Sequence, residues 1–149
     1  MLSPVKSEVG ELFKFDQNGI RINIPFFASP VKAGFPSPAE DYAESRIDLN
    51  ADLIPNPDST FYSRVEGDSM EPLIHVGSML VIDRAQETLS GDIVLAFING
   101  EFCMKRLFLS SNGGGIKLIS ENPAYKAIVI TGEMDFAIWG KIIHVIQSF

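Results

Sequence analysis

A mainly β fold, with one compact and mostly antiparallel domain after a flexible N-terminal arm, is predicted by three observations. From residue 60 onward the chain consists of short runs rich in β-branched and aromatic residues. Turn residues separate these runs, and Asn99-Gly100 between two apolar runs is typical of a type I′ hairpin. Four prolines between residues 25 and 38 interrupt any regular element there. We therefore expect an arm over 1–45 and a β-rich domain over 46–149.

The arm contains few recognisable elements. Its first 19 residues show no clean hydrophobic period, and no element is predicted for them. The run Ile20 to Ile24 alternates between apolar and polar residues and stops at Pro25, as expected for an edge strand. Ser37, Pro38 and Glu40 have the spacing of a capping box, which predicts the start of a short helix.

The β-rich domain is predicted to contain seven strands separated by turns. A flexible loop tip is expected at the three glycines of 113–115. The predicted strands are TFYSRVEG, SMLVID, DIVLAFI, EFCMKRLFL, IKLIS, AIVIT and FAIWGKIIHVI.

Composition limits the classes of function. The 149 residues are 46% hydrophobic and 21% charged, which suits a single domain with an ordinary core. The net charge of −7 and the absence of a basic cluster argue against direct sequence-specific DNA binding and favour a protein partner. A single cysteine fits a reducing compartment, and neither a metal motif nor a cofactor motif is visible. Without a long apolar run or a signal peptide, we expect a cytoplasmic protein that does not contact a membrane.

Ser69 is the candidate nucleophile. It follows Gly67-Asp68 directly after a predicted strand, in the stretch VEGDSMEPL. A serine in a turn at a strand end can present its hydroxyl to a substrate, and backbone N–H groups near Asp68 and Met70 could hold an oxyanion.

Lys105 is the candidate base. In EFCMKRLFL it alternates with Cys103, Leu107 and Leu109, so it shares a strand face with apolar or soft residues. If that face is buried, the neutral amine is favoured over the ammonium and can accept a serine proton. The alternative is a structural lysine that reaches solvent from a strand edge.

The two histidines are weaker candidates for the base. His75 lies in a turn-like segment and His144 in the last predicted strand, and neither falls in a familiar Ser-His-Asp order. We expect both to be structural or exposed.

These motifs together resemble those of the UmuD/LexA family of self-cleaving proteins. The resemblance extends from about Ile24 to Val145, and its most specific part is the order Ala33-Gly34, Ser69, Lys105. It includes KAGFPSPAEDY, RIDLN, NPDSTFY, GDSM, LVID, GDIVLAFINGEF, KRL, NPAY and WGKIIHV.

The resemblance implies cleavage of the chain's own Ala33–Gly34 bond. Ser69 would attack the Ala33 carbonyl, and Lys105 would take the serine proton and pass it to the Gly34 amine. Val31 would fill an apolar subsite.

Cys103 stands two residues before the lysine. In the family this position usually holds a hydroxyl residue that helps to orient the amine.

The family also implies partners and a biological role. Cleavage would be stimulated by a RecA filament on single-stranded DNA during the SOS response. The cleaved product, a homodimer, would join a UmuC-type Y-family polymerase in error-prone translesion synthesis. The arm is too short for the DNA-binding domain of a repressor, which favours the UmuD-like members.

Three other functions remain open at this point. The first is a dimeric polymerase accessory module without self-cleavage, in which the KAGFPSP stretch only docks. The second is a type I signal peptidase, suggested by SMEP at Ser69, although that enzyme needs a membrane anchor. The third is a phage-type repressor.

Overall fold

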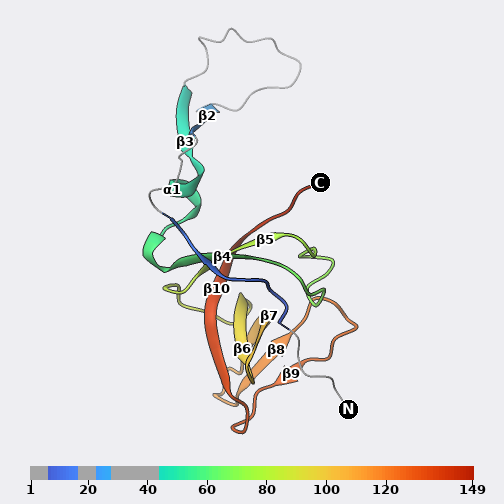
Figure 1. Ribbon diagram of the computed structural model, residues 1–149. Coiled ribbons are helices and arrows are strands. Elements are labelled where there is room, and N and C mark those ends of the chain that lie inside the picture. Colours follow the sequence, from blue (N-terminus) through green and yellow to red (C-terminus); the bar gives the residue numbers. More distant parts are fainter. Residues whose placement is uncertain (1–6, 17–22, 28–43) are drawn as a thin grey trace. The chain divides into compact units, whose positions relative to one another are not determined.

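The computed structural model describes residues 7–16, 23–27 and 44–149 (Figure 1). Two compact units are present. One contains the N-terminal residues up to Phe15 together with Asp58–Phe149, and the other contains Asp16–Pro57. The predicted capping box and the residues Val31, Ala33 and Gly34 lie outside the described residues. The domain boundary at residue 45 stays a prediction.

The smaller unit contains a two-stranded antiparallel ribbon and one helical turn. Strand β2 (Asn23–Phe27) pairs with β3 (Glu44–Asp48), and α1 (Leu49–Leu53) follows. The prediction that this strand stops at Pro25 was wrong, because β2 continues through Pro25 to Phe27. Each strand of a ribbon has one open edge, so a residue without an N–H group is tolerated there.

The larger unit is an eight-stranded antiparallel sheet in the order β1-β4-β5-β10-β6-β7-β8-β9. This confirms the predicted mainly β, mostly antiparallel fold. A short 3-10 helix, η2 (Pro57–Ser59), leads into the second strand of that order. The strands are β1 (Phe13–Lys14), β4 (Thr60–Arg64), β5 (Met79–Asp83), β6 (Ile93–Ile98), β7 (Glu101–Leu109), β8 (Ile116–Ile119), β9 (Ile128–Val129) and β10 (Phe136–Ile146).

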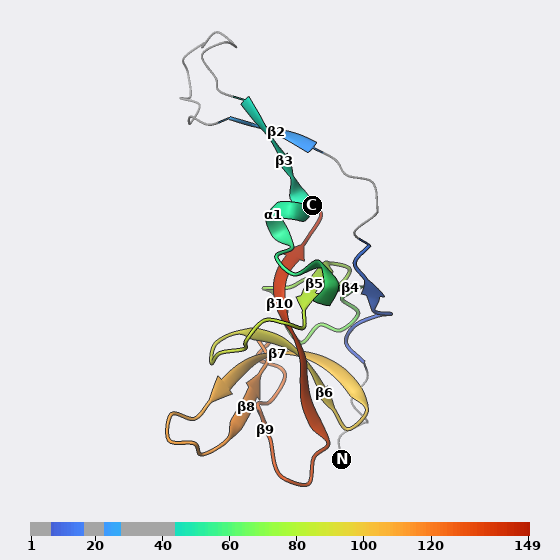
Figure 2. The same ribbon diagram turned by 90° about the vertical axis from the view of Figure 1, so that its left-hand side faces the viewer.

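Strand β10 connects the two halves of the sheet. Its first half pairs with β6 and its second half with β5, and a register irregularity occurs in each pairing. The strand therefore runs along the whole unit, with β5 beside one end and β6 beside the other (Figure 2).

The hairpin between β6 and β7 positions the candidate lysine. Asn99 and Gly100 both have positive φ, 48° and 90°, which confirms the predicted type I′ turn. The turn fixes the register Ile98↔Glu101 and, further along, Val94↔Lys105. A one-residue slip would move Lys105 to the other face of the sheet.

The core consists of two clusters. Alternate residues of β6 enter different clusters, with Leu95 in the first and Val94 in the second. The first cluster contains Val9, Val65, Met70, Ile74, Leu80, Ile82, Leu95, Met104 and Ile142. The second contains Val94, Ala96, Ile98, Cys103, Leu107 and Leu118. Both faces of the β6–β7 hairpin are therefore covered.

Residues 7–15, here called the N-terminal segment, run antiparallel along β4 and along residues 65–67, which follow it and are here called its extension. Phe13 pairs with Tyr62, and Val9 forms a bridge with Val65. Gly10 N–H donates to the carbonyl of Arg64 at 2.9 Å. Val9 is 3% exposed and joins the first core cluster. The sequence did not predict this segment as an element, and it leads directly to the candidate site.

Candidate active site

Ser69 lies in the turn that follows the extension of β4. Its side chain is fully buried, and its hydroxyl donates a long hydrogen bond of 3.4 Å to the Met104 carbonyl. Its own carbonyl accepts from Asn122 N–H at 2.9 Å. The Met70 side chain enters the first core cluster, so the backbone is what Met70 can offer the site. The turn thus holds Ser69 against the middle of β7.

Lys105 is buried on β7, next in the chain to the residue whose carbonyl Ser69 contacts. It is 4% exposed, and its neighbours at alternate positions, Cys103 and Leu107, are fully buried. The expected buried face is confirmed at these three positions, while Leu109 is 42% exposed. Arg106 points the other way and binds Glu121 at 2.7 Å.

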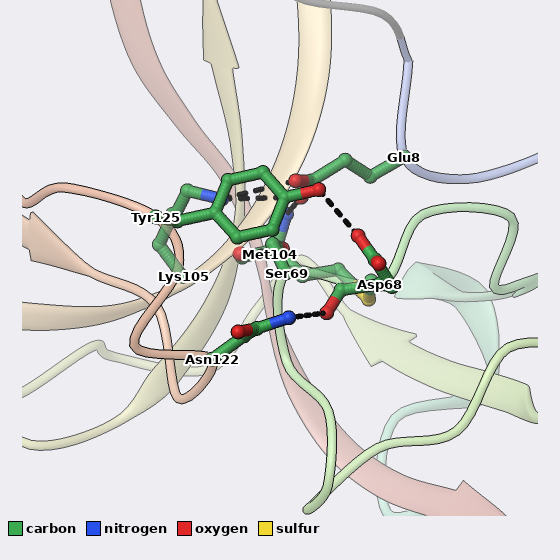
Figure 3. Close-up of polar contacts among 7 residues, drawn as sticks. All are labelled: Glu8, Asp68, Ser69, Met104, Lys105, Asn122 and Tyr125. Carbon is green, nitrogen blue, oxygen red and sulfur yellow. Dashed lines mark hydrogen bonds and ion pairs between the residues drawn. The ribbon is translucent and has the colours of Figure 1, made fainter.

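Glu8 of the N-terminal segment is the direct partner of Lys105. Lys105 Nζ donates to Glu8 Oε1 at 3.0 Å and lies 3.3 Å from Oε2. The backbone N–H of Met104 also donates to Oε2, at 2.7 Å. Figure 3 shows Glu8, Lys105, Met104 and Ser69 gathered at one place. The pair is buried, with 5% of the lysine and 10% of the glutamate side chain exposed.

Close packing against Gly67 helps to fix Glu8. A Cβ atom at Gly67 would lie 2.9 Å from Glu8 Cγ, which is closer than such atoms approach. The Glu8 carbonyl accepts from Glu66 N–H at 2.8 Å and from Gly67 N–H at 3.0 Å. A glycine two residues before Ser69 therefore allows the N-terminal segment to approach the nucleophile turn.

Asn122 and Tyr125 attach a loop to the same turn. Asn122 Nδ2 donates to the Asp68 carbonyl at 3.0 Å, and the Tyr125 hydroxyl donates to the Asp68 carboxylate. The Tyr125 ring centroid lies 5.6 Å from Lys105 Nζ. The hydrogen bond to Asp68 raises the pKa of Tyr125, and burial and the Asp68 charge add to it. In Figure 3 this ring stands in front of the site.

Cys103 is fully buried two residues before Lys105. Burial raises the pKa of its thiol to about 11, although the positive charge of Lys105 acts in the opposite direction. The proposed role of Cys103 in orienting the lysine stays a prediction. In this structure the Lys105 amine donates a hydrogen bond to the Glu8 carboxylate.

The histidines lie elsewhere, in keeping with the expected structural or exposed roles. His75 Nδ1 is 2.6 Å from Glu71 Oε2 in an exposed turn, and this hydrogen bond lowers the pKa of Glu71. His144 lies in β10, opposite Val81 of β5. Among the residues that the structure describes, no group of three His, Cys, Asp or Glu side chains could hold a metal ion.

Sequence reasoning missed Glu8, Asn122 and Tyr125 as residues of this site. The stretch NPAY contributed to the family resemblance, but no role was attached to its asparagine or tyrosine. Glu8 gave no signal, because it lies in a region of mixed charge without periodicity and its partner is 97 residues away.

A family model described as Peptidase S24-like matches residues 25–143. The chain belongs to the Peptidase S24-like family. The match spans most of both units and includes Ser69 and Lys105. It confirms the resemblance to the self-cleaving UmuD/LexA proteins.

Curated relatives of the S24-like chain support the same assignment. It is 40% identical to Protein SamA of Salmonella typhimurium, over 89% of this chain and 94% of the relative. It is 42% identical to Protein ImpA of the same organism, over 83% of each chain. A LexA repressor of Carboxydothermus hydrogenoformans is 32% identical over 99% of this chain and 71% of the repressor.

In the described parts of the chain, no helix is long and apolar enough to cross a membrane.

Proposed function

We propose that this S24-like protein is a self-cleaving serine peptidase of the SOS response, with Ser69 as nucleophile and Lys105 as general base. One observation carries the proposal. Ser69 and Lys105, 36 positions apart in the chain, are both buried at one place, where Ser69 contacts the backbone of the residue preceding Lys105. Ser-Lys pairs are an established variant of serine catalysis.

The proposed reaction uses these two side chains in sequence. Ser69 Oγ attacks the carbonyl carbon of Ala33 while its proton passes to the neutral Lys105 amine. Collapse of the tetrahedral intermediate breaks the bond to Gly34, whose nitrogen takes the proton from Lys105. Water then hydrolyses the acyl-enzyme and regenerates Ser69. Backbone N–H groups of the Asp68–Met70 turn are the proposed oxyanion donors.

We further propose the partners that the family resemblance implies. A RecA filament on single-stranded DNA would favour docking of the cleavage segment, which is a shift between existing states. The cleaved form, residues 34–149, would act in the cytoplasm as a homodimer with a UmuC-type polymerase. The net charge of −7 supports recognition of DNA damage through a protein rather than through direct contact with DNA.

The test is the intact mass of the purified chain after incubation with RecA, single-stranded DNA and a nucleoside triphosphate. A second sample without RecA is held at alkaline pH, where lysine amines are neutral. We expect a break between Ala33 and Gly34 in both, and none in Ser69→Ala or Lys105→Ala. A Lys117→Ala variant, which alters an exposed lysine of β8, is the matched control and should cleave normally.

A second candidate function is an uncut polymerase accessory module. The contact of Lys105 with Glu8 favours it, because a lysine held by a carboxylate can be purely structural. That function predicts an intact chain in every sample and a Ser69→Ala variant that supports translesion synthesis as well as the wild type.

A further inference from the structure

We propose that the N-terminal segment is autoinhibitory: residues 7–10 occupy the strand position beside Ser69 that a scissile peptide needs, and Glu8 holds Lys105. This inference rests on the proposed function of the site. It concerns the state of the intact chain before cleavage.

The backbone of Glu8 joins the two elements that carry the candidate dyad. Its N–H donates to the Phe102 carbonyl of β7 at 3.0 Å. Its carbonyl accepts from Glu66 and Gly67, which lead to Ser69, at 2.8 and 3.0 Å. An extended peptide that presents a carbonyl to Ser69 would add to the same edges by main-chain hydrogen bonds. The N-terminal segment and such a peptide therefore compete for these groups.

The side chain of Glu8 acts on the base itself. A general base must offer a lone pair to the serine proton, so Lys105 must be neutral and directed at Ser69. The Lys105 amine donates to Glu8, and the Ser69 hydroxyl donates to the Met104 carbonyl. The two candidate catalytic groups are thus each engaged with another partner.

The contact is part of the packed structure rather than a surface tether. Glu8 is 8% exposed and Val9 is 3% exposed, and Val9 packs in the first core cluster. A side chain larger than hydrogen at Gly67 would collide with Glu8. Activation therefore requires release of this buried segment. A partner that stimulates cleavage would have to favour the state in which the segment is released.

The experiment uses the full-length wild-type chain, full-length point variants and one truncated variant, with two readouts. The first is self-cleavage at pH 7.5, followed by intact mass. The second is covalent labelling of Ser69 by a small fluorophosphonate, which needs an activated serine but does not need the cleavage segment. The variants are Glu8→Gln and a chain lacking residues 1–10. Glu11→Gln is the matched control, because Glu11 is an exposed carboxylate of the same segment. Ser69→Ala defines the background of labelling.

We expect Glu8→Gln and the truncated chain to be labelled at least tenfold faster than wild type and Glu11→Gln. Self-cleavage without RecA should accelerate by a similar factor. Faster labelling without any chain cleavage would support the autoinhibition while removing the self-cleavage function. Normal wild-type cleavage with labelling unchanged or slower in both variants would overturn the autoinhibition and make Glu8 a supporting residue. Absence of both reactions in all variants would overturn both proposals.

Discussion

Glu8 and Lys105 are 97 positions apart in the chain, and their side chains form a buried ion pair with an Nζ–Oε1 distance of 3.0 Å. The pair ties the first packed residues to the strand that carries the candidate base. Substitutions that test this arrangement and the site around it are best made in a Ser69→Ala background, so that the chain stays intact.

The ion pair should show strong coupling in a double-mutant cycle. Removing one partner of a buried pair leaves an uncompensated charge and costs about 3–5 kcal/mol. We expect Glu8→Gln and Lys105→Met each to lower the free energy of unfolding in urea. The double variant buries no charge there, so its loss should be smaller than the sum of the two single losses by about 1–3 kcal/mol. Additive losses would show that the two charges do not interact.

Gly67→Ala should displace the N-terminal segment. The new Cβ would lie 2.9 Å from Glu8 Cγ, and overpacking of this kind costs about 1–3 kcal/mol. Hydrogen exchange should become faster at the amides of Glu8 and Gly10, which now donate to Phe102 and Arg64. Gly132→Ala is the control, because nothing lies within 4 Å of its Cβ. Equal protection in both variants would contradict the close packing.

Cys103 should make the protein sensitive to alkaline pH. Burial raises the pKa of its thiol from 9.0 to about 11 in the folded chain. Between these values the unfolded chain loses the proton and the folded chain keeps it, so stability falls as pH rises from 9 to 11. The stabilisation present below pH 9 and lost by pH 11 is about 2–3 kcal/mol relative to Cys103→Ala. Urea unfolding of both proteins at pH 8.5, 10 and 11 measures this difference in the free energy of unfolding. The difference would not change with pH if the thiol of the folded chain ionised near pH 9.

Tyr125 should ionise at unusually high pH because of Asp68. The carboxylate accepts the tyrosine hydrogen bond and repels a tyrosinate, and both effects raise the pKa of Tyr125. We expect Asp68→Asn to lower that pKa toward the ordinary value near 10. Carbon-13 NMR of labelled tyrosine, with the signal assigned through Tyr125→Phe, follows the titration. An unchanged titration in Asp68→Asn would place the tyrosine hydroxyl elsewhere.

Local sequence patterns were enough to predict most of the β domain. Alternation in EFCMKRLFL placed Cys103, Lys105 and Leu107 on a buried face, and Asn99-Gly100 fixed the hairpin that sets their register. The strand at Pro25 was misplaced because the rule that prolines end strands is weaker at an open edge.

Non-local contacts account for what the sequence could not predict. Glu8 becomes part of the site only through pairing of residues 8–10 with β4 and its extension, and nothing in the local pattern specifies that partner. Tyr125 and Asn122 reach the site through side-chain bonds to a turn more than 50 residues earlier. Ser69 could be predicted because a strand end followed by a turn is a local signal. Lys105 could be predicted because it alternates with apolar residues along one strand and so shares their buried face.

The N-terminal segment also covers the free side of β4. Arg64, Glu66 and Gly67 all form backbone hydrogen bonds with Glu8 or Gly10. A break at residue 33, as proposed, would sever this segment from the domain and allow it to diffuse away. The row of backbone donors and acceptors along β4 would then be open, and an open row of this kind is a template for a strand from another chain. Scission would in that case create a new place of assembly as well as a shorter protein.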